Sequence, residues 1–314
     1  MPARLCHHAR SSLSGWVQDP RPGHPCARAL SLPLLALVLA TLLSGALVAF
    51  LAHFWPRVDL DPEPSEPVSR WARRLDPGAA TGLALTLAFA ALMLGGVVLG
   101  VLALVTRRDP DAIGLDASAA RWGHAHATAF TDDVIGALTH VGQPRTIVAL
   151  AVVLAVVETA RTRSPWIAPF LLVVVVGNGI VTTTIKHVFD RVRPEFNPVA
   201  ETLGPSFPSG HSSWSAAFFA AAALVLARHR GRRARELLAG TAAGIAVAIA
   251  ATRVLLDVHW LSDVVAGLAL GWAWFAACAI AFGGRLLRFG ATAEAVRDAA
   301  PDPGARTPAS ARGR

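Results

Sequence analysis

The chain contains few cysteines and a single lysine. Cys6, Cys26 and Cys278 are the only cysteines among 314 residues, and no C-x-x-C pair occurs. This pattern supports neither a disulfide scaffold nor a cysteine-based zinc site. Of the 29 lysines and arginines, only Lys186 is a lysine. A lysine kept at one position beside a long apolar run marks that position as a candidate functional site.

Charged residues make up 16% of the chain and hydrophobic residues 54%, with a mean hydropathy of +0.48. Soluble domains are less apolar than this. The net charge of +8 arises from arginines in loops beside apolar runs, a distribution that membrane topology requires and nucleic-acid binding does not. We therefore predict an all-α, polytopic helical bundle in the lipid bilayer, with no nucleic-acid partner.

Several apolar runs approach or exceed the length of about 20 residues that crosses a bilayer. They predict about six to seven transmembrane helices, over residues 30–54, 79–105, 144–160, 166–186, 211–228, 237–256 and 262–283. Residues 113–140 are amphipathic, and we expect them to form an interfacial helix rather than a span.

Composition divides the chain into four parts. Residues 1–29 and 291–314 are rich in polar residues and proline, and we expect disordered tails there. Residues 30–78 are expected to add an N-terminal membrane helix and its loop. Residues 79–290 are expected to form the main membrane-embedded domain.

The arginine distribution predicts the orientation of the spans. Five arginines within residues 228–235 favour the cytoplasmic side. An odd number of spans then puts the N-terminal tail, with its four arginines, outside. Either the run at 30–54 is not a simple span, or the later helices override it; a signal segment is a further alternative.

Three polar blocks interrupt the apolar runs. The first block is Lys186-His-Val-Phe-Asp-Arg-Val-Arg193-Pro194, the second is Pro208-Ser209-Gly210-His211, and the third runs from Thr252 to Asp263. Between the second and third blocks lie two apolar runs and an arginine-rich loop, which predict one helical hairpin that returns to the same face. No apolar run separates the first two blocks, so all three should meet at one membrane face, outside the cytoplasm.

The third block has the composition of an oriented nucleophile. His259 and Asp263 are four residues apart, so on a helix they share one face. The carboxylate can fix the tautomer of the imidazole and leave its other nitrogen free to attack. Arg253 lies six residues before His259 and cannot share a straight helical stripe with it, which predicts a helix break near Asp257.

The remaining block residues suit a phosphoryl group. Lys186, Arg193 and Arg253 can offset charge on the phosphoryl oxygens. Ser209 can cap the helix that follows it, and the free amides at that helix start favour an anion. His211 can act as general acid toward the leaving oxygen.

Each of these residues also has a structural alternative. A lone histidine such as His211 is usually interfacial, Ser209 is usually only a cap, and Lys186 or Arg253 alone would be a snorkelling anchor. The joint order and spacing favours the phosphate site. His124, His126 and His140 lack a carboxylate spacing for a metal, so no metal site is expected.

The three blocks resemble the signature motifs of the type 2 phosphatidic acid phosphatase family, K-x6-R-P, P-S-G-H and S-R-x5-H-x3-D. Every spacing matches, and one residue departs, because Thr252 stands where the family has serine. Threonine keeps the hydroxyl. The resemblance extends over about residues 79–283. Soluble vanadate-dependent haloperoxidases share the anion pocket, but the apolar runs favour a membrane enzyme.

The resemblance implies a phosphatase core within residues 79–290 and dephosphorylation through a phosphohistidine, with no metal and no cofactor. His259 would be the nucleophile, Asp263 would orient it, and His211 would protonate the leaving group and then activate water. The implied phosphate-binding residues are Lys186, Arg193, Ser209, Gly210 and Arg253.

Several lipid phosphates remain open as substrates, because the recognised contacts all go to phosphate. An outward-facing site on the plasma membrane favours hydrolysis of undecaprenyl diphosphate to undecaprenyl phosphate in cell-wall synthesis. Phosphatidate and phosphatidylglycerophosphate are alternatives. A non-catalytic lipid-phosphate binding or transport protein is an alternative of another class. Binding alone does not need both histidines and Asp263, and no broken-helix pair repeats across two halves as in many transporters.

Overall fold

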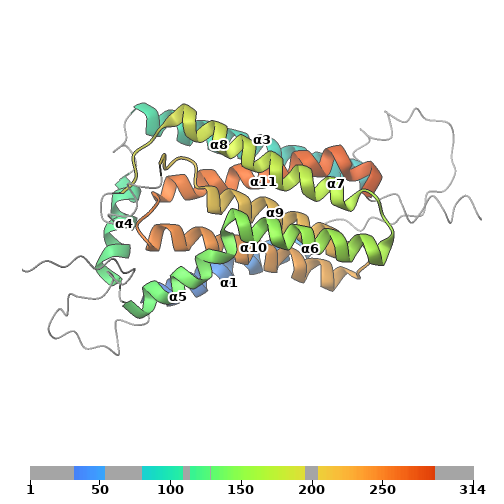
Figure 1. The fold of residues 1–314 in the computed structure, drawn as a ribbon, viewed down its shortest axis with the longest axis horizontal. Coiled ribbons are helices and arrows are strands. Elements are labelled where there is room, and N and C mark those ends of the chain that lie inside the picture. Colours follow the sequence, from blue (N-terminus) through green and yellow to red (C-terminus); the bar gives the residue numbers. More distant parts are fainter. Residues whose placement is uncertain (1–31, 54–79, 109–113, 128, 195–203, 287–314) are drawn as a thin grey trace, which may run out of the picture.

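The computed structural model describes residues 32–53, 80–108, 114–127, 129–194 and 204–286, and both predicted tails lie outside them. The described residues form helices and no strands, which confirms the all-α prediction (Figure 1). The α-helices are α1 Leu32–His53, α3 Ala80–Arg108, α4 Gly114–His126, α5 Ala129–Thr139, α6 Pro144–Thr162, α7 Ile167–Leu172, α8 Asn178–Phe189, α9 Gly210–Ala227, α10 Arg232–Leu255 and α11 Leu261–Leu286.

Within the described residues, six helical segments are long and apolar enough to cross a membrane, and the number rises to seven if the bent pair of α5 and α6 forms one span. One of the six is the run Ile167–Phe189, in which a π-helical turn at Val173–Gly177 joins α7 to α8. The predicted six to seven spans are therefore confirmed, and the chain is a multi-pass membrane protein. Large apolar side chains such as Leu43 and Leu94, which are 67% and 66% exposed, lie on the outer surface of the bundle, where lipid replaces water.

Helix α1 runs antiparallel to α10. Gly45 of α1 lies against the backbone of Gly240, and Thr41 lies against Gly244. Residue numbers therefore increase along α1 in the direction in which they decrease along α10. Helix α1 therefore starts at the end of the bundle where α10 finishes, which is the end that carries the third block. Its length and hydropathy suit a membrane span, while the choice among the three alternatives for residues 30–54 stays a prediction.

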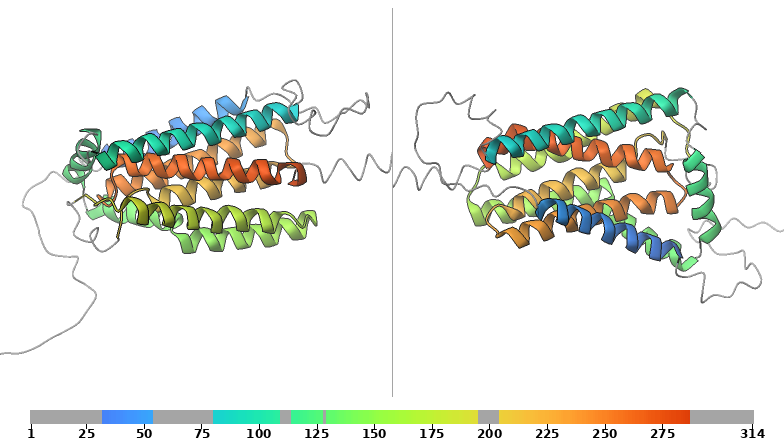
Figure 2. Two further views of the ribbon diagram at one scale, coloured as in Figure 1. Left: turned by 90° about the horizontal axis from the view of Figure 1, so that it is seen from above. Right: turned by 180° about the vertical axis from the view of Figure 1, so that it is seen from behind.

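Two predicted boundaries need correction. Residues 113–140 form two helices rather than one: α4 lies across the end of the bundle, and α5 meets α6 at a bend of 50° (Figures 1 and 2). Helix α10 begins at Arg232 rather than at residue 237, because Arg232 pairs with Glu236 one turn later at 2.7 Å and supports the charged first turn.

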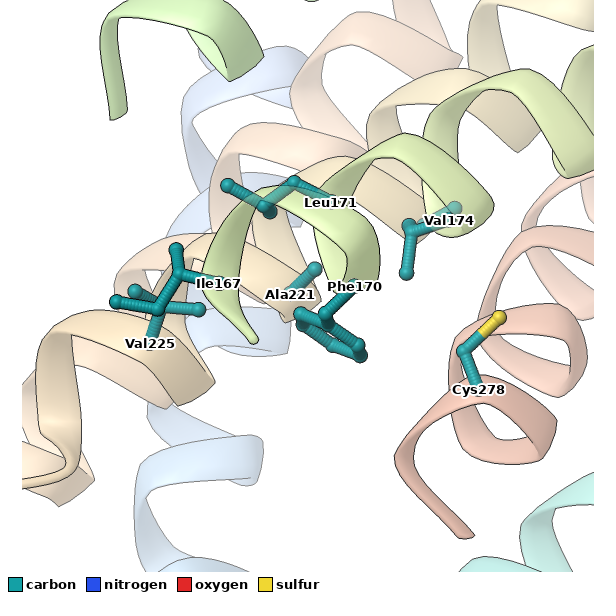
Figure 3. Packing of buried hydrophobic residues seen from close by; sticks show 8 residues of the cluster. Ile167, Phe170, Leu171, Val174, Ala221, Val225 and Cys278 are labelled. Carbon is teal, nitrogen blue, oxygen red and sulfur yellow. The ribbon is translucent and has the colours of Figure 1, made fainter. Parts of the chain in front are cut away.

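A hydrophobic cluster holds α7, α9 and α11 together at the half of the bundle away from the three blocks (Figure 3). The ring of Phe170 is fully buried and stacks edge-on against Phe282 at 5.7 Å. Beside it, the indole of Trp274 donates to the carbonyl groups of Val173 and Val174 in the π-helical turn. The other labelled members are Ile167, Leu171, Ala221, Val225 and Cys278.

Glycines on α11 bring α9 unusually close. A Cβ atom on Gly267 would lie 2.5 Å from the carbonyl oxygen of Ser209, and one on Gly271 would lie 2.3 Å from that of Ser213. Small residues allow such backbone contact between membrane helices. This contact fixes the second block, at the start of α9, against the third block, at the start of α11.

We expect Gly271→Ala to lower the melting temperature of the purified protein in detergent, because the new methyl group would overlap the backbone of Ser213. Gly96→Ala is the matched control, since no atom lies within 4 Å of a Cβ built at Gly96 and both sites gain the same helix propensity. Equal melting temperatures for the two variants would show that the α9–α11 contact is not tight.

Candidate active site

The three blocks meet at one end of the bundle, at the end of α8, the start of α9 and the turn between α10 and α11. That turn contains the predicted helix break: α10 ends at Leu255, and Asp257 adopts a left-handed conformation with φ of 54°. The amides of Val258 and His259 both donate to the carbonyl oxygen of Arg253 at 3.2 Å. The break turns His259 back toward Arg253, as their spacing predicts.

His259 is buried and faces Asp263. Its Nδ1 lies 3.4 Å from Oδ2 of Asp263, which also accepts the amide N–H of Trp260 at 3.1 Å. The other carboxylate oxygen, Oδ1, accepts a hydrogen bond of 2.6 Å from Arg191. Asp263 lies in the first turn of α11, where the helix dipole favours a negative charge. Both oxygens of the carboxylate thus accept hydrogen bonds. Because Oδ2 faces Nδ1 of His259, the proton of the imidazole lies on Nδ1.

The other ring nitrogen of His259 faces the cations. Burial lowers the pKa of His259 to about 3, against the opposing effect of Asp263, so the imidazole is neutral near pH 7. With Nδ1 protonated, Nε2 carries the ring's lone pair and can accept a hydrogen bond. The nearest donor is Nη1 of Arg193 at 3.1 Å. A neutral Nε2 beside a guanidinium has the chemistry that a nucleophile next to a bound anion would need.

Carbonyl oxygens hold two of the predicted cations. Arg193 donates to the carbonyl oxygens of Val258 at 2.5 Å and Gly204 at 2.7 Å, which fixes its planar guanidinium. Burial lowers the pKa of Arg193, but an arginine starts so high that it stays charged. Lys186 donates to the carbonyl oxygen of Pro205 at 2.5 Å and lies within electrostatic range of Arg193 and Arg253. None of these partners neutralises the charge.

Arg253 is oriented by a residue that the sequence did not indicate. Its Nη1 donates to Oγ1 of Thr139 at 2.8 Å, and Oγ1 of Thr252 donates to the same oxygen at 3.0 Å. Thr252, the one motif residue that differs from the family pattern, therefore uses its hydroxyl to bind Thr139. Nε of Arg253 is buried and has no partner among the described residues, so this donor remains for an anion.

The second block differs in one detail from the prediction. Ser209 occupies the N-cap position of α9, but its hydroxyl makes no capping bond and instead accepts from Oγ of Ser212 at 2.9 Å. The backbone amide of Ser209 donates to the carbonyl oxygen of Asp263 at 2.9 Å. Gly210 begins the helix and lies close to Lys186. A Cβ atom added to Gly210 would lie 4.0 Å from Cε of that lysine.

His211 stands in the first turn of α9 and lies within electrostatic range of Arg253, Arg193, Lys186 and His259. Its ring forms no hydrogen bond with any described residue, so both nitrogens are available to a ligand. All eight predicted site residues are therefore brought to one place.

Besides Thr139, the sequence analysis did not indicate two further residues in contact with the site, Arg191 and Asp116. Arg191 binds Asp263 directly, and Asp116 of α4 binds Arg191 at 3.0 Å. The place of Arg191 within the first block, two positions before Arg193, could have indicated that it lies at the site. Nothing in the sequence around Asp116 connects that residue to the blocks. Within the described ranges, no group of three His, Cys, Asp or Glu residues has the arrangement of a metal site.

Comparison with protein families gives one family model, described as PAP2 superfamily, which matches residues 167–286. The chain is 38% identical over 135 residues to a lipid A 1-phosphatase of Rhizobium johnstonii, and 37% identical over 135 residues to that of Rhizobium etli. Each match covers 38% of this chain. The chain spans about half the length of these relatives, 50% and 53%.

A third relative is phosphatidylglycerophosphatase B of Bacillus subtilis, with 30% identity over 145 residues, which cover 45% of this chain and 70% of that protein. The fold resembles the crystal structure of a transmembrane PAP2 type phosphatidylglycerolphosphate phosphatase from Bacillus subtilis. The TM-score is 0.58 at 24% identity, over 63% of this chain and 98% of that chain. At this identity the likeness establishes the fold alone.

The neutral state of His259 predicts a pH-dependent stability. Its folded pKa of about 3 lies below the ordinary value of 6.5, so the unfolded chain binds a proton that the folded chain does not. Stability is therefore lost as the pH falls from about 6.5 toward 3, by about 2 kcal/mol at pH 5.

We expect the melting temperature of His259→Gln to fall less between pH 7 and pH 5 than that of the unaltered protein. His187→Gln, at an exposed histidine, should keep the original pH dependence; equal slopes for all three proteins would contradict a neutral, buried His259.

Thr139→Val should weaken phosphate binding, because it leaves Nη1 of the buried Arg253 without its acceptor. We expect roughly a tenfold higher dissociation constant for inorganic phosphate by titration calorimetry, the effect of about one charged hydrogen bond. Thr139→Ser retains the hydroxyl and should bind as the original protein does. An unchanged constant in the valine variant would show that Thr139 does not orient Arg253.

Proposed function

The chain belongs to the PAP2 superfamily, and we propose that it is an integral-membrane phosphohydrolase that removes a terminal phosphate from a lipid phosphate or diphosphate through a phosphohistidine. The observation that carries the proposal is the setting of His259. Its neutral Nε2 points at Arg193, while its Nδ1 is held by the buried carboxylate of Asp263. A neutral imidazole with one nitrogen fixed and the other beside a cluster of cations suits attack on a phosphorus atom.

In the proposed reaction the lone pair of His259 Nε2 forms a bond to phosphorus, and the bond from phosphorus to the lipid oxygen breaks. His211 gives a proton to that leaving oxygen. Water then attacks the phosphohistidine, His211 takes the proton of the water, and the nitrogen–phosphorus bond breaks to release inorganic phosphate. Lys186, Arg193 and Arg253 offset the charge on the phosphoryl oxygens, most strongly where it spreads in the transition state.

The cations gathered around His259 suit a phosphoryl group, so we propose a class of substrates defined by a terminal phosphate on a lipid. Undecaprenyl diphosphate is the first candidate, because an active site on the outer face of the plasma membrane would meet it there. That orientation rests on the arginines of residues 228–235, at the end of the bundle opposite the three blocks. The named relatives favour phosphatidylglycerophosphate and the 1-phosphate of lipid A as further candidates, and phosphatidate shares the same chemistry.

Phosphate release by the purified protein tests the proposal, with undecaprenyl diphosphate, phosphatidylglycerophosphate, lipid A 1-phosphate and phosphatidate assayed side by side in EDTA. We expect release of phosphate from at least one lipid. The rate of release should fall at least 1,000-fold in His259→Ala, because that variant lacks the nucleophile. His187→Ala, at an exposed histidine of α8, is the matched control and should retain full activity.

The other outcomes identify the alternatives. Tight phosphate binding without release by folded protein would point to a lipid-phosphate binding or transport protein. Equal release by the His259→Ala protein would remove the phosphohistidine. Loss of release in EDTA, with recovery on adding a divalent cation, would replace the proposed chemistry by metal-assisted hydrolysis.

A further inference from the structure

We propose that Asp116 and Arg191 form a clamp that positions Asp263, and through Asp263 sets the nucleophilic His259. The inference rests on the proposed function, but it concerns residues outside the matched motif positions. Asp116 comes from α4, which lies across the end of the bundle and contributes nothing to the three blocks (Figure 1). Asp116 and Arg191 are thus assigned as positioning residues, which touch neither substrate nor reacting atoms.

Asp116 binds the first turn of α11. Its side chain is 3% exposed, and Oδ1 accepts the amide N–H of Ser262 at 2.8 Å. Oδ2 accepts Oγ of Ser262 at 2.5 Å and Nη2 of Arg191 at 3.0 Å. The amide of Ser262 is one of the donors that a helix start leaves unsatisfied. Asp116 therefore caps α11 from another helix while it holds Arg191.

Arg191 joins the two carboxylates. Nη1 donates to Oδ1 of Asp263 at 2.6 Å and to Oγ of Ser262 at 2.8 Å, while Nη2 reaches Asp116. Its side chain is only 8% exposed, and the guanidinium carbon lies 5.5 Å from the centre of the Trp260 ring. A planar guanidinium held at both ends cannot rotate without breaking a charged bond.

The clamp fixes the rotation of the Asp263 carboxylate. With Oδ1 held by Arg191, Oδ2 is left to His259 and to the amide of Trp260. The distance from Oδ2 to Nδ1 of His259 is 3.4 Å, near the limit of a hydrogen bond. A small rotation of the carboxylate would break that bond and release the imidazole, so the orientation of His259 depends on what holds the opposite oxygen.

A purely structural role explains this arrangement less well. A buried ion pair adds little net stability, because desolvation of both charges offsets their attraction. Here one cation is shared by two carboxylates that are 3% and 0% exposed, which stabilises no more than well-packed apolar residues would. What the charged arrangement does supply is a fixed geometry at the carboxylate that faces His259. Helix α4 also docks on the turn after α10, where Gly123 lies against Val254 and Asp257, so Asp116 is held in place by packing.

Asp116→Asn tests the clamp, because asparagine keeps the shape and can still accept from Ser262 but loses the charge that holds Arg191. We expect kcat for lipid phosphate hydrolysis to fall between 10-fold and 100-fold, as for other residues that orient a reacting group. KM should change by less than about twofold, because the phosphate-binding cations are untouched. Asp133→Asn removes an exposed carboxylate at the same end of the bundle, on α5, and should leave both constants unchanged.

A double-mutant cycle separates positioning from general loss of structure. If Asp116 acts through Asp263, then Asp116→Asn lowers kcat in the original protein but not further in Asp263→Asn. An equal reduction in both backgrounds would overturn the proposal, and so would a rise in KM without a fall in kcat. Melting temperatures of all variants identify any loss of kcat that comes from unfolding, and restoration of activity by Asp116→Glu would argue for the charge.

Vanadate binding provides a readout that does not need turnover. Vanadate imitates the five-coordinate phosphorus of the transition state and bonds to a correctly oriented nucleophile. We expect the original protein to bind vanadate, and Asp116→Asn to bind it at least tenfold more weakly. If the protein released phosphate from no lipid, the proposed function would fail, yet this difference in vanadate affinity would still support the clamp. Equal affinities, or no binding by the original protein, would overturn it.

Discussion

The position of one carboxylate, that of Asp263, ties the three blocks together. Arg191 from the first block binds its Oδ1, and the amide of Ser209 from the second block binds its backbone oxygen. His259 and the amide of Trp260 share its Oδ2. A carboxylate without exposure to solvent is unfavourable unless every lone pair is used, so these contacts stabilise both the ion and the arrangement. The site is therefore assembled around a carboxylate that is closed off from solvent.

The bundle supplies the close approach that this arrangement needs. Gly267 and Gly271 let α9 and α11 touch through their backbones, and this contact is what brings the amide of Ser209 to Asp263. In lipid there is no hydrophobic force between helices, so backbone packing of small residues and hydrogen bonds must hold them. Apolar side chains of α1 and α3 can then face outward without loss. Stability and site geometry thus depend on the same two helices.

Much of this arrangement followed from local sequence. Long apolar runs predicted the spans, and the six-residue step from Arg253 to His259 predicted the break that ends α10. Thr139, Arg191 and Asp116 could not be predicted in this way, because they act on residues 114, 72 and 146 positions away in the chain. The prediction that the hydroxyl of Ser209 caps α9 was wrong for a related reason. Local sequence favours a cap, but Ser212 on the next turn donates to that hydroxyl instead. Spacing reports which residues share an element, whereas long-range partners depend on how elements pack.

The contact between Arg193 and His259 links binding to activation in the proposed reaction. Nη1 of Arg193 donates to Nε2 of His259, so a hydrogen bond engages the lone pair that should attack. A phosphate dianion is a stronger acceptor for a guanidinium than a neutral imidazole is. Its arrival would draw Arg193 onto the phosphoryl oxygens and release the lone pair of Nε2. The same donor would then serve the nucleophile first and the phosphoryl group afterwards. His259 needs no separate base to become reactive, since burial keeps its ring neutral and Asp263 keeps its proton on Nδ1.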